Sequence, residues 1–334
     1  PVRGETQDVA TKITALTGFA FWETNLAYEG ESIYNYLQVK NLSDRTILST
    51  NVLFGVQSVT MKDKGLTGMY YDTALAAPAL ADNANSALIL GMGTGTYARQ
   101  LKQYYPKMNI TGVEIDQTIT DLAGEYFDEP ADIPVTTYDG RAWLAASHDK
   151  YDVIMVDAYQ DITIPFQMSS TEFFTMVREH LNPGGVMVVN MNMISDGQGS
   201  INEALSDTIA SVFGNGNTLT ADVPNTTNRE LFAKKPGSGS EENSMQQASK
   251  ALNLRETTYE RTGSEDLEWY MEEVASRFRK VNEPDSASTI LTDDKAPVEV
   301  LGMHAIDQII ADEAGPYRQI LKDEGFGGLL RAVQ

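Results

Sequence analysis

One segment of the chain, residues 86–116, combines two apolar runs with a glycine-rich turn between them. An apolar run at 87–90 is followed by a turn with Gly91, Gly93 and Gly95 and then by a helix-compatible stretch to about Tyr105. A second apolar run at 110–113 ends at Glu114, 21 residues after Gly93. Nucleoside-binding α/β folds use this order, because glycines let the backbone turn sharply beside the ligand and the acid accepts hydrogen bonds from ribose hydroxyls. We therefore predict a nucleoside site here, with Glu114 on the ribose.

The chain continues the alternation of strands and helices well beyond this segment. The expected strands end near Leu90, Glu114, Thr137, Asp157 and Asn190, and the expected helices cover residues 97–105, 117–127, 141–146 and 170–181. Such alternation predicts an α/β fold with a doubly wound, mostly parallel, Rossmann-like sheet. Ligands of such sheets bind at the carboxyl ends of the strands.

The two flanks of this region follow different patterns. Short alternating runs at 34–39, 46–48 and 52–59 predict a small N-terminal β module, and residues 70–80 predict a connecting helix that Pro78 bends or ends. A polar linker begins near Gly237, and acidic helices are expected over 246–253, 267–280, 306–311 and 317–321. We therefore expect three parts, namely residues 1–82, a nucleoside-binding domain over 83–236, and a linker with a helical extension over 237–334.

Composition limits the partners and the chemistry. The 334 residues carry a net charge of −22, which disfavours nucleic acid and favours small cations. The chain has no cysteine and only three scattered histidines, so we expect no disulfide, no thiolate catalysis and no metal site. No apolar run is long enough for a membrane span. The absence of cysteine fits a reducing cytoplasm, and we expect the protein there.

Polar residues follow each of the first four expected parallel strands. The second strand is followed by Glu114 and Asp116, the third by Asp139 before Gly140, and the fourth by Asp157. Since these strand ends line one crevice, we expect Asp139 to accept from the exocyclic amine of adenine and Asp157 to lie nearest the reacting centre. A solvated loop residue or a helix cap is the alternative interpretation of each acid.

Several motifs occur in the order that one family uses. They are ESIYNY from Glu31, GVQ from Gly55, YYD from Tyr70, GMGTGT from Gly91, VEID from Val113, YDGR from Tyr138 and VDAY from Val156. Over about residues 21–235 the chain thereby resembles the polyamine aminopropyltransferase (spermidine synthase) family, which shares the class I S-adenosylmethionine methyltransferase fold. The pair formed by DAYQDITIPFQMSSTEFF and LTDDKAPVE (291–299) is similar to bacterial members fused to an N-terminal membrane domain. On that likeness we expect the soluble part of a membrane-fused protein, at the cytoplasmic face of the membrane.

The resemblance also implies roles for individual residues. Ten residues are expected to bind S-adenosylmethionine or its decarboxylated form. Asn35 and Gln57 would lie beside the nucleoside, Glu114 would bind the ribose, and Asp139 would bind the adenine amine. The residues expected around them are Gly91, Gly93, Thr94, Gly95, Asp116 and Gly140. Tyr70 is expected to position an amine substrate with Tyr71 and Asp72, and Trp22 to wall the same cavity. Ordinary aromatic packing is the alternative for Trp22, Tyr70 and Tyr71. The expected catalytic residues are Asp157, Tyr159 and Asp161.

Two positions depart from the family pattern. Typical members read GGGDGG in the turn, where this chain has Thr94, and they carry an acid where this chain has Gln160, one residue before Asp161. An alkylamine is mostly protonated at neutral pH and needs an acceptor for its proton before it attacks a sulfonium, so Asp157 or Asp161 must supply that acceptor. A neutral turn also accommodates the full amino-acid moiety of S-adenosylmethionine, which leaves the donor open.

The resemblance predicts a spermidine synthase-like transferase that moves the alkyl arm of the donor to a polyamine such as putrescine and releases 5′-methylthioadenosine. Three alternatives remain open. They are lyase-type cleavage of S-adenosylmethionine by its own carboxylate, methyl transfer, and non-catalytic nucleoside sensing. Asp293 and Asp294 either close over the cavity or form a turn before Pro297. The oligomeric state is also open, a homo-oligomer included.

Overall fold

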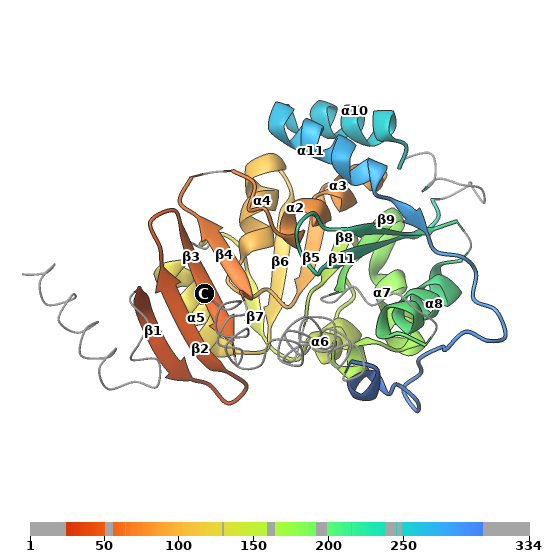
Figure 1. Cartoon of the computed structure of the whole chain (residues 1–334), viewed down its shortest axis with the longest axis horizontal. Coiled ribbons are helices and arrows are strands. Elements are labelled where there is room, and N and C mark those ends of the chain that lie inside the picture. The colour runs from red at the N-terminus through yellow and green to blue at the C-terminus, as the bar shows by residue number, and fades with distance from the viewer. Residues whose placement is uncertain are drawn as a thin grey trace, which may run out of the picture.

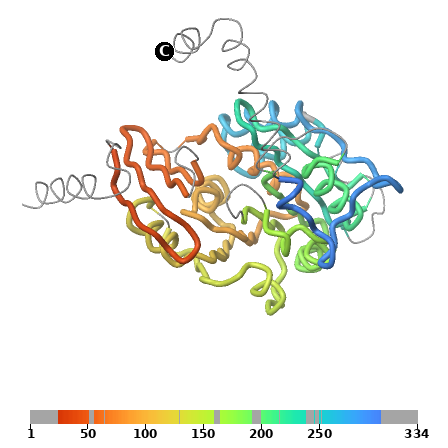
Figure 2. Tube along the Cα trace, turned by 60° about the horizontal axis from the view of Figure 1, so that its bottom comes forward, coloured from red at the N-terminus to blue at the C-terminus, as the bar shows by residue number. Residues whose placement is uncertain are grey.

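A computed structural model describes residues 25–50, 56–63, 65–128, 130–158, 164–191, 199–214, 216–237, 245 and 249–302. Two sheets lie side by side in it (Figures 1 and 2). The smaller sheet is antiparallel, with the strand order β1 (Leu26–Glu31), β2 (Tyr36–Asn41), β3 (Arg45–Thr50) and β4 (Ser58–Met61). It is the small N-terminal β module that the sequence predicts, with different strand boundaries.

The larger sheet has eight strands in the order β12-β10-β11-β9-β8-β5-β6-β7. Their bounds are β5 Ser86–Leu90, β6 Asn109–Glu114, β7 Val135–Thr137, β8 Tyr151–Val156, β9 Leu181–Met191, β10 Thr218–Asp222, β11 Arg229–Lys234 and β12 Arg279–Lys280. The five strands from β7 to β9 are parallel, and β11, β10 and β12 continue the sheet in antiparallel pairs. The predicted doubly wound, mostly parallel α/β fold is therefore confirmed.

Helices cover both faces of this sheet. They are α2 (Tyr70–Ala74), α3 (Ala76–Leu80), α4 (Thr96–Tyr104), α5 (Gln117–Tyr126), α6 (Gly140–Ala146), η1 (Phe166–Met168), α7 (Thr171–His180), α8 (Ile201–Phe213), α10 (Ala251–Thr262) and α11 (Glu265–Ser276). In Figure 1, α2, α3, α4, α10 and α11 lie above the sheet, while α6, α7 and α8 lie below it. All six residues of β8 are buried, as a central parallel strand covered on both faces requires.

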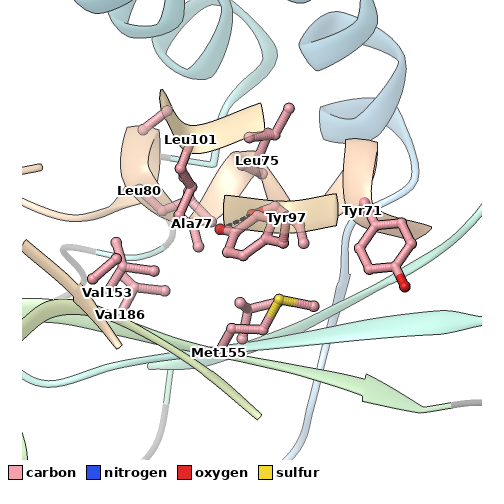
Figure 3. Packing of buried hydrophobic residues seen from close by; sticks show 14 of the residues in the cluster. Tyr71, Leu75, Ala77, Leu80, Tyr97, Leu101, Val153, Met155 and Val186 are labelled. Atoms are coloured by element: carbon pink, nitrogen blue, oxygen red, sulfur yellow. Dashed lines mark hydrogen bonds between the residues drawn. The ribbon is translucent and has the colours of Figure 1, made fainter. Parts of the chain in front are cut away.

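Two hydrophobic clusters form the core on the two faces. On the upper face, Val153, Met155 and Val186 of the sheet pack under Leu75, Ala77 and Tyr97, as Figure 3 shows. The Tyr97 hydroxyl donates to the Ala74 carbonyl at 3.0 Å, which pairs a buried hydroxyl with a partner. A third, smaller cluster joins Leu37 and Leu48 of the small sheet to Phe127 after α5, and this contact seats the small sheet beside the strand ends of the large one.

The connecting helix differs from its prediction. It is divided at Leu75 into α2 and α3, and Pro78 lies within the first turn of α3 rather than at a break. Proline is tolerated there because the first N–H groups of a helix have no partner within that helix. The division thus lies at Leu75, three residues before the proline to which the sequence assigns it.

The segment after residue 237 belongs to the same core. Met245, Leu254, Leu267 and Met271 are buried in the upper cluster, and β12 pairs with β10 at the edge of the large sheet. The helix expected over 267–280 ends at Ser276. The helix expected over 246–253 overlaps only the start of α10, which runs from Ala251 to Thr262, and residues 246–248 lie outside the described residues. The helices expected over 306–311 and 317–321 lie outside the described residues. Within the described part of the chain, no helix is both long and apolar enough to cross a bilayer.

Candidate active site

A cavity of about 320 Å³ opens at the carboxyl ends of the parallel strands, beside the small sheet. Ten of the predicted site residues line it, namely Asn35, Gln57, Tyr70, Tyr71, Gly91, Gly93, Glu114, Asp139, Gly140 and Asp157. They come from distant parts of the chain, since Asn35 directly precedes β2 and Asp157 directly follows β8. The structure therefore brings most of the predicted site together in one place.

The glycine turn after β5 forms one wall of the cavity. Gly91, Gly93 and Gly95 have φ angles of 89°, 55° and 78°, in the left-handed region that glycine adopts without strain. A Cβ on Gly91 would overlap the main-chain carbonyl of Asp157, and one on Gly93 would lie 2.9 Å from Ser58 Oγ. The turn therefore needs glycine at both positions, and Gly95 begins α4 behind the cavity wall.

Glu114 at the end of β6 is a buried acid held by main-chain donors. Its carboxylate accepts from the Gly93 N–H at 2.8 Å and from the Asp116 N–H at 3.0 Å. Burial raises the pKa of Glu114, and these two hydrogen bonds act against that rise. The side chain is thus fixed at the cavity wall, in a position suited to ribose hydroxyls.

Asp116 does not line the cavity, although the sequence predicts it as a binding residue. It caps α5 by accepting from the Thr118 N–H at 3.0 Å, and it also accepts from Ser32 Oγ at 2.5 Å and from Asn35 Nδ2 at 3.2 Å. Ser32 and Asn35 lie between β1 and β2. Asp116 therefore ties the β1–β2 turn to the large sheet and holds Asn35 beside the cavity.

Asp139 lines the cavity and caps a helix as well. Its Oδ1 atom accepts from the Ala142 N–H at 2.8 Å at the start of α6. The helix-cap interpretation of Asp139 is thus confirmed, and the binding of an adenine amine stays a prediction. Gly140 follows in the cavity wall.

Asp157, directly after β8, has a carboxylate fixed by two side chains from distant segments. Tyr70 of α2 donates its hydroxyl to Oδ2 at 2.7 Å, and Asn190 of β9 donates its amide to Oδ1 at 2.9 Å. The Asn190 carbonyl in turn accepts from Asn228 Nδ2 at 2.9 Å, which sets the orientation of the amide. Shielding from solvent raises the pKa of Asp157 to about 7, so this acid can gain and lose a proton near neutral pH.

Two stacked tyrosines form the wall next to Asp157. The ring centroids of Tyr70 and Tyr71 lie 4.0 Å apart. Tyr71 donates its hydroxyl to the main-chain carbonyl of Gln57 at 2.7 Å, which fixes the small sheet against α2. Burial raises the pKa of both phenols well above 10, so they remain neutral donors. The two rings pack together, as the alternative interpretation predicts, and they also line the cavity, while the positioning of an amine substrate stays a prediction.

Asp72 and Thr94 lie away from the cavity, contrary to prediction. Asp72 is fully buried and accepts four hydrogen bonds, from Thr67 N–H and Oγ1, Gly68 N–H and Gln100 Nε2, so it anchors the loop before α2. Thr94 is also fully buried, its N–H donates to Ser58 Oγ at 3.4 Å, and its hydroxyl has no partner. The turn thus presents neither a carboxylate nor the Thr94 hydroxyl to a ligand.

Three further predicted residues, Trp22, Tyr159 and Asp161, lie outside the described residues, as does Gln160. Sequence reasoning missed Asn190, because nothing in the apolar strand VMVVN marks its last residue as a partner of Asp157.

Asp293 lies in a turn closed by Thr292 and Lys295. Its carboxylate accepts from Nη1 and Nη2 of Arg141 at 2.7 and 2.6 Å. Arg141 also donates to the carbonyl of Gln167, a cavity residue, so this ion pair supports the wall from outside.

Several known proteins resemble this chain in sequence or in fold. Residues 69–235 match the spermine/spermidine synthase domain family. The chain is 98% identical over 327 residues, 98% of its length and 73% of the relative's, to a protein of Bifidobacterium longum named probable polyamine aminopropyl transferase. It is 28% identical over 211 residues, 60% of its length and 69% of the relative's, to a polyamine aminopropyltransferase of Vibrio vulnificus. The crystal structure of a probable spermidine synthase from Corynebacterium glutamicum superposes with a TM-score of 0.56 at 20% identity, over 79% of this chain and 98% of that one, which shows a shared fold.

The fold is a mostly parallel α/β sheet with an added N-terminal β module, and the relatives show that the protein is a transferase. More closely, the chain belongs to the spermine/spermidine synthase family.

Proposed function

We propose that this protein transfers the aminopropyl group of decarboxylated S-adenosylmethionine to a small alkylamine such as putrescine and releases 5′-methylthioadenosine. The observation that carries the proposal is the charge of the cavity. Its described lining residues include three acids, Glu114, Asp139 and Asp157, and no lysine, arginine or histidine. Such a cavity suits a cationic donor and a cationic acceptor.

The same charge pattern bears on the donor that the sequence left open. Intact S-adenosylmethionine carries a carboxylate, which here would meet Asp157 and Glu114 with no cation among the described lining residues. The decarboxylated form lacks that group and keeps its ammonium. The cavity therefore favours the decarboxylated donor, although Thr94 supplies no carboxylate in the turn.

The nucleoside would lie over β5, β6 and β7. Glu114 would accept from the ribose hydroxyls, Asp139 would accept from the adenine amine, and the left-handed glycines would let the ligand approach the turn. Asn35 and Gln57 border this part of the cavity. The sulfonium arm would then extend toward Asp157.

In the reaction, the acceptor enters as an ammonium and gives one proton to the Asp157 carboxylate. The neutral nitrogen attacks the donor carbon bonded to sulfur, so that a C–N bond forms while the C–S bond breaks. Sulfur leaves with the bonding electron pair as a neutral thioether, and the positive charge moves to the new secondary amine. The sulfonium needs no acid to leave, so the protein contributes positioning and a proton acceptor of suitable pKa.

Mass spectrometry of the products tests the proposal. The protein is incubated with decarboxylated or intact S-adenosylmethionine, each with and without putrescine. We expect equimolar 5′-methylthioadenosine and spermidine only from the decarboxylated donor with putrescine. Methylthioadenosine without consumption of amine would indicate lyase chemistry, S-adenosylhomocysteine would indicate methyl transfer, and absence of any product would support a nucleoside sensor.

A further inference from the structure

Asn228 is the last residue of the turn between β10 and β11, which spans residues 223–228 and is called here the β10–β11 turn. Its Nδ2 atom donates to Oδ1 of Asn190 at 2.9 Å, and Nδ2 of Asn190 donates to Oδ1 of Asp157 at 2.9 Å. Of these three residues, Asp157 alone lines the cavity. Two amide hydrogen bonds in series therefore join the turn to the acid that we propose as the proton acceptor.

The main chain of the β10–β11 turn fixes the position of Asn228. The Val223 N–H donates to the Asn228 carbonyl at 3.0 Å, and the Asn228 N–H donates to Thr226 Oγ1 at 3.1 Å. Asn225, in the same turn, has a φ of 57°, a left-handed conformation that asparagine adopts more readily than most residues. The Asn228 side chain is thus carried by a backbone that hydrogen bonds within the turn hold in place.

The direction of the two hydrogen bonds determines which form of Asp157 they favour. A carboxamide has a donor at one end and an acceptor at the other, so Asn228, by donating to the Asn190 oxygen, turns the Asn190 nitrogen toward Asp157. An N–H donor favours the ionised carboxylate. A rotated Asn190 amide would present its oxygen instead, which repels a carboxylate and accepts from a protonated carboxyl. Asn228 opposes that rotation, because two NH₂ groups would then face each other.

The surroundings of Asp157 make these neutral donors important. The titratable side chains that act on Asp157 or respond to its charge come from three elements. They are Tyr70 and Tyr71 of α2, Glu114 of β6 and Glu230 of β11. A negative charge on either glutamate opposes ionisation of Asp157. Burial raises the pKa of Asp157 to about 7, and the hydrogen bonds from Asn190 and Tyr70 act against that rise.

We propose that Asn228 is a positioning residue, which fixes the Asn190 amide and thereby holds Asp157 in the ionised form that accepts the proton of the amine. This inference rests on the proposed function, in which Asp157 takes that proton. It assigns a role in the reaction to the β10–β11 turn, none of whose residues lines the cavity. Without Asn228, the Asn190 amide is free to rotate when Asp157 is protonated, and the protonated acid gains a partner.

Titration of the Asp157 carboxyl by carbon NMR with labelled aspartate tests the inference without turnover. The resonance is assigned by its absence from Asp157→Asn and is followed in wild type, Asn228→Leu and Asn228→Asp. Leucine removes the donor at similar size, whereas aspartate accepts from the Asn190 nitrogen and turns the Asn190 oxygen toward Asp157. We expect the midpoint to rise by about half a pH unit in Asn228→Leu and by about one unit or more in Asn228→Asp. Unchanged midpoints in both variants would overturn the proposal.

Two controls separate the series of hydrogen bonds from other effects of these substitutions. Asn225→Asp adds the same charge at an exposed position of the same turn, and it should move the midpoint by less than about a quarter of a unit. In an Asn190→Leu background, Asn228→Leu should cause no further shift, because the connection to Asp157 is already broken. An equal shift in both backgrounds would show that Asn228 acts by another route and would overturn the proposal. Asn228→Ala takes the place of the leucine variant if that one does not fold.

A pH–rate profile connects the titration to the reaction. The fall in kcat toward low pH should move to higher pH in both Asn228 variants, by the same amount as the NMR midpoint. The Kd for 5′-methylthioadenosine should stay within about twofold of wild type, since the nucleoside contacts are unchanged. If the midpoints shift and no aminopropyl transfer occurs, the proposed function fails while the action of Asn228 on Asp157 stands. If transfer occurs and the midpoints do not shift, the inference alone fails.

Discussion

The two sides of the cavity hold their acids in different ways. On the side that we propose for the nucleoside, which we call the nucleoside side, Glu114 and Asp139 accept from main-chain N–H groups at most 21 residues away in sequence. On the side that we propose for the amine, which we call the amine side, Asp157 accepts from the side chains of Tyr70 and Asn190, 87 and 33 residues away. The nucleoside side is therefore built by local backbone geometry, whereas the amine side depends on tertiary packing.

This difference predicts that the two sides can be damaged separately. Substitutions on the nucleoside side should weaken binding of the nucleoside, and substitutions on the amine side should slow the reaction or change its pH dependence. A single substitution that both weakens nucleoside binding and slows the reaction would contradict this separation of the two sides.

Asp157→Asn should have the largest effect. Asparagine cannot accept the proton of the acceptor ammonium, and its single carbonyl cannot satisfy both Tyr70 and Asn190. We expect kcat to fall by about 10³-fold. Release of methylthioadenosine at saturating donor and amine measures it, and a loss below about tenfold would remove Asp157 from the role of proton acceptor.

Glu114→Gln should come next and act on the other side. Glutamine keeps the size of the side chain but loses the charge that strengthens hydrogen bonds to ribose hydroxyls. We expect the Kd for methylthioadenosine to rise by about 10- to 100-fold, as for loss of a charged hydrogen bond. At saturating donor, kcat should change by less than about fivefold, and a larger change in kcat than in Kd would speak against a binding role.

Tyr70→Phe should have a smaller effect that depends on pH. The wild-type rate should decline as the pH falls through about 7, because Asp157 becomes protonated there. The Tyr70 hydrogen bond lowers the pKa of Asp157, so its removal should move this decline to higher pH. A pH–rate profile of kcat for both proteins measures the shift, and movement toward lower pH would contradict the assigned hydrogen bond.

Glu230→Leu, at a fully buried acid of β11 that does not line the cavity, should change the pH dependence of stability. The buried acid has a raised pKa, so its contribution to stability is full below the unfolded-state pKa near 4.5 and is lost as the pH rises through the folded-state value. We expect the variant to unfold at about the wild-type temperature near pH 5 and about 2 °C or more higher at pH 9. Thermal melts at the two pH values measure this, and a variant less stable at pH 9 would show that Glu230 has a structural partner.

The sequence predicted the nucleoside side better than the amine side for a physical reason. The glycine turn, Glu114 and Asp139 are set by strands and turns that a short window of sequence encodes, and the structure places them as expected. The same patterns mark Asn190 only as the end of a strand. They do not indicate its hydrogen bond to Asp157, because that contact forms only when β8 and β9 pair.

Long-range packing also explains the misplaced residues. Asp72 follows two cavity tyrosines in sequence, yet it turns inward to the loop at Thr67 because α2 presents successive side chains in different directions. Thr94 lies between two glycines of positive φ and is fully buried, outside the cavity lining. β12 could not be predicted, because two residues form a strand only when an edge such as β10 is available.

Binding of 5′-methylthioadenosine to wild type, Asp157→Asn and Glu114→Gln, measured by calorimetry at pH 8, tests the division of the cavity most directly. We expect Asp157→Asn to bind within about twofold of wild type while its turnover is lost, and Glu114→Gln to bind at least about tenfold more weakly. Loss of nucleoside binding in Asp157→Asn, together with unchanged binding in Glu114→Gln, would contradict it.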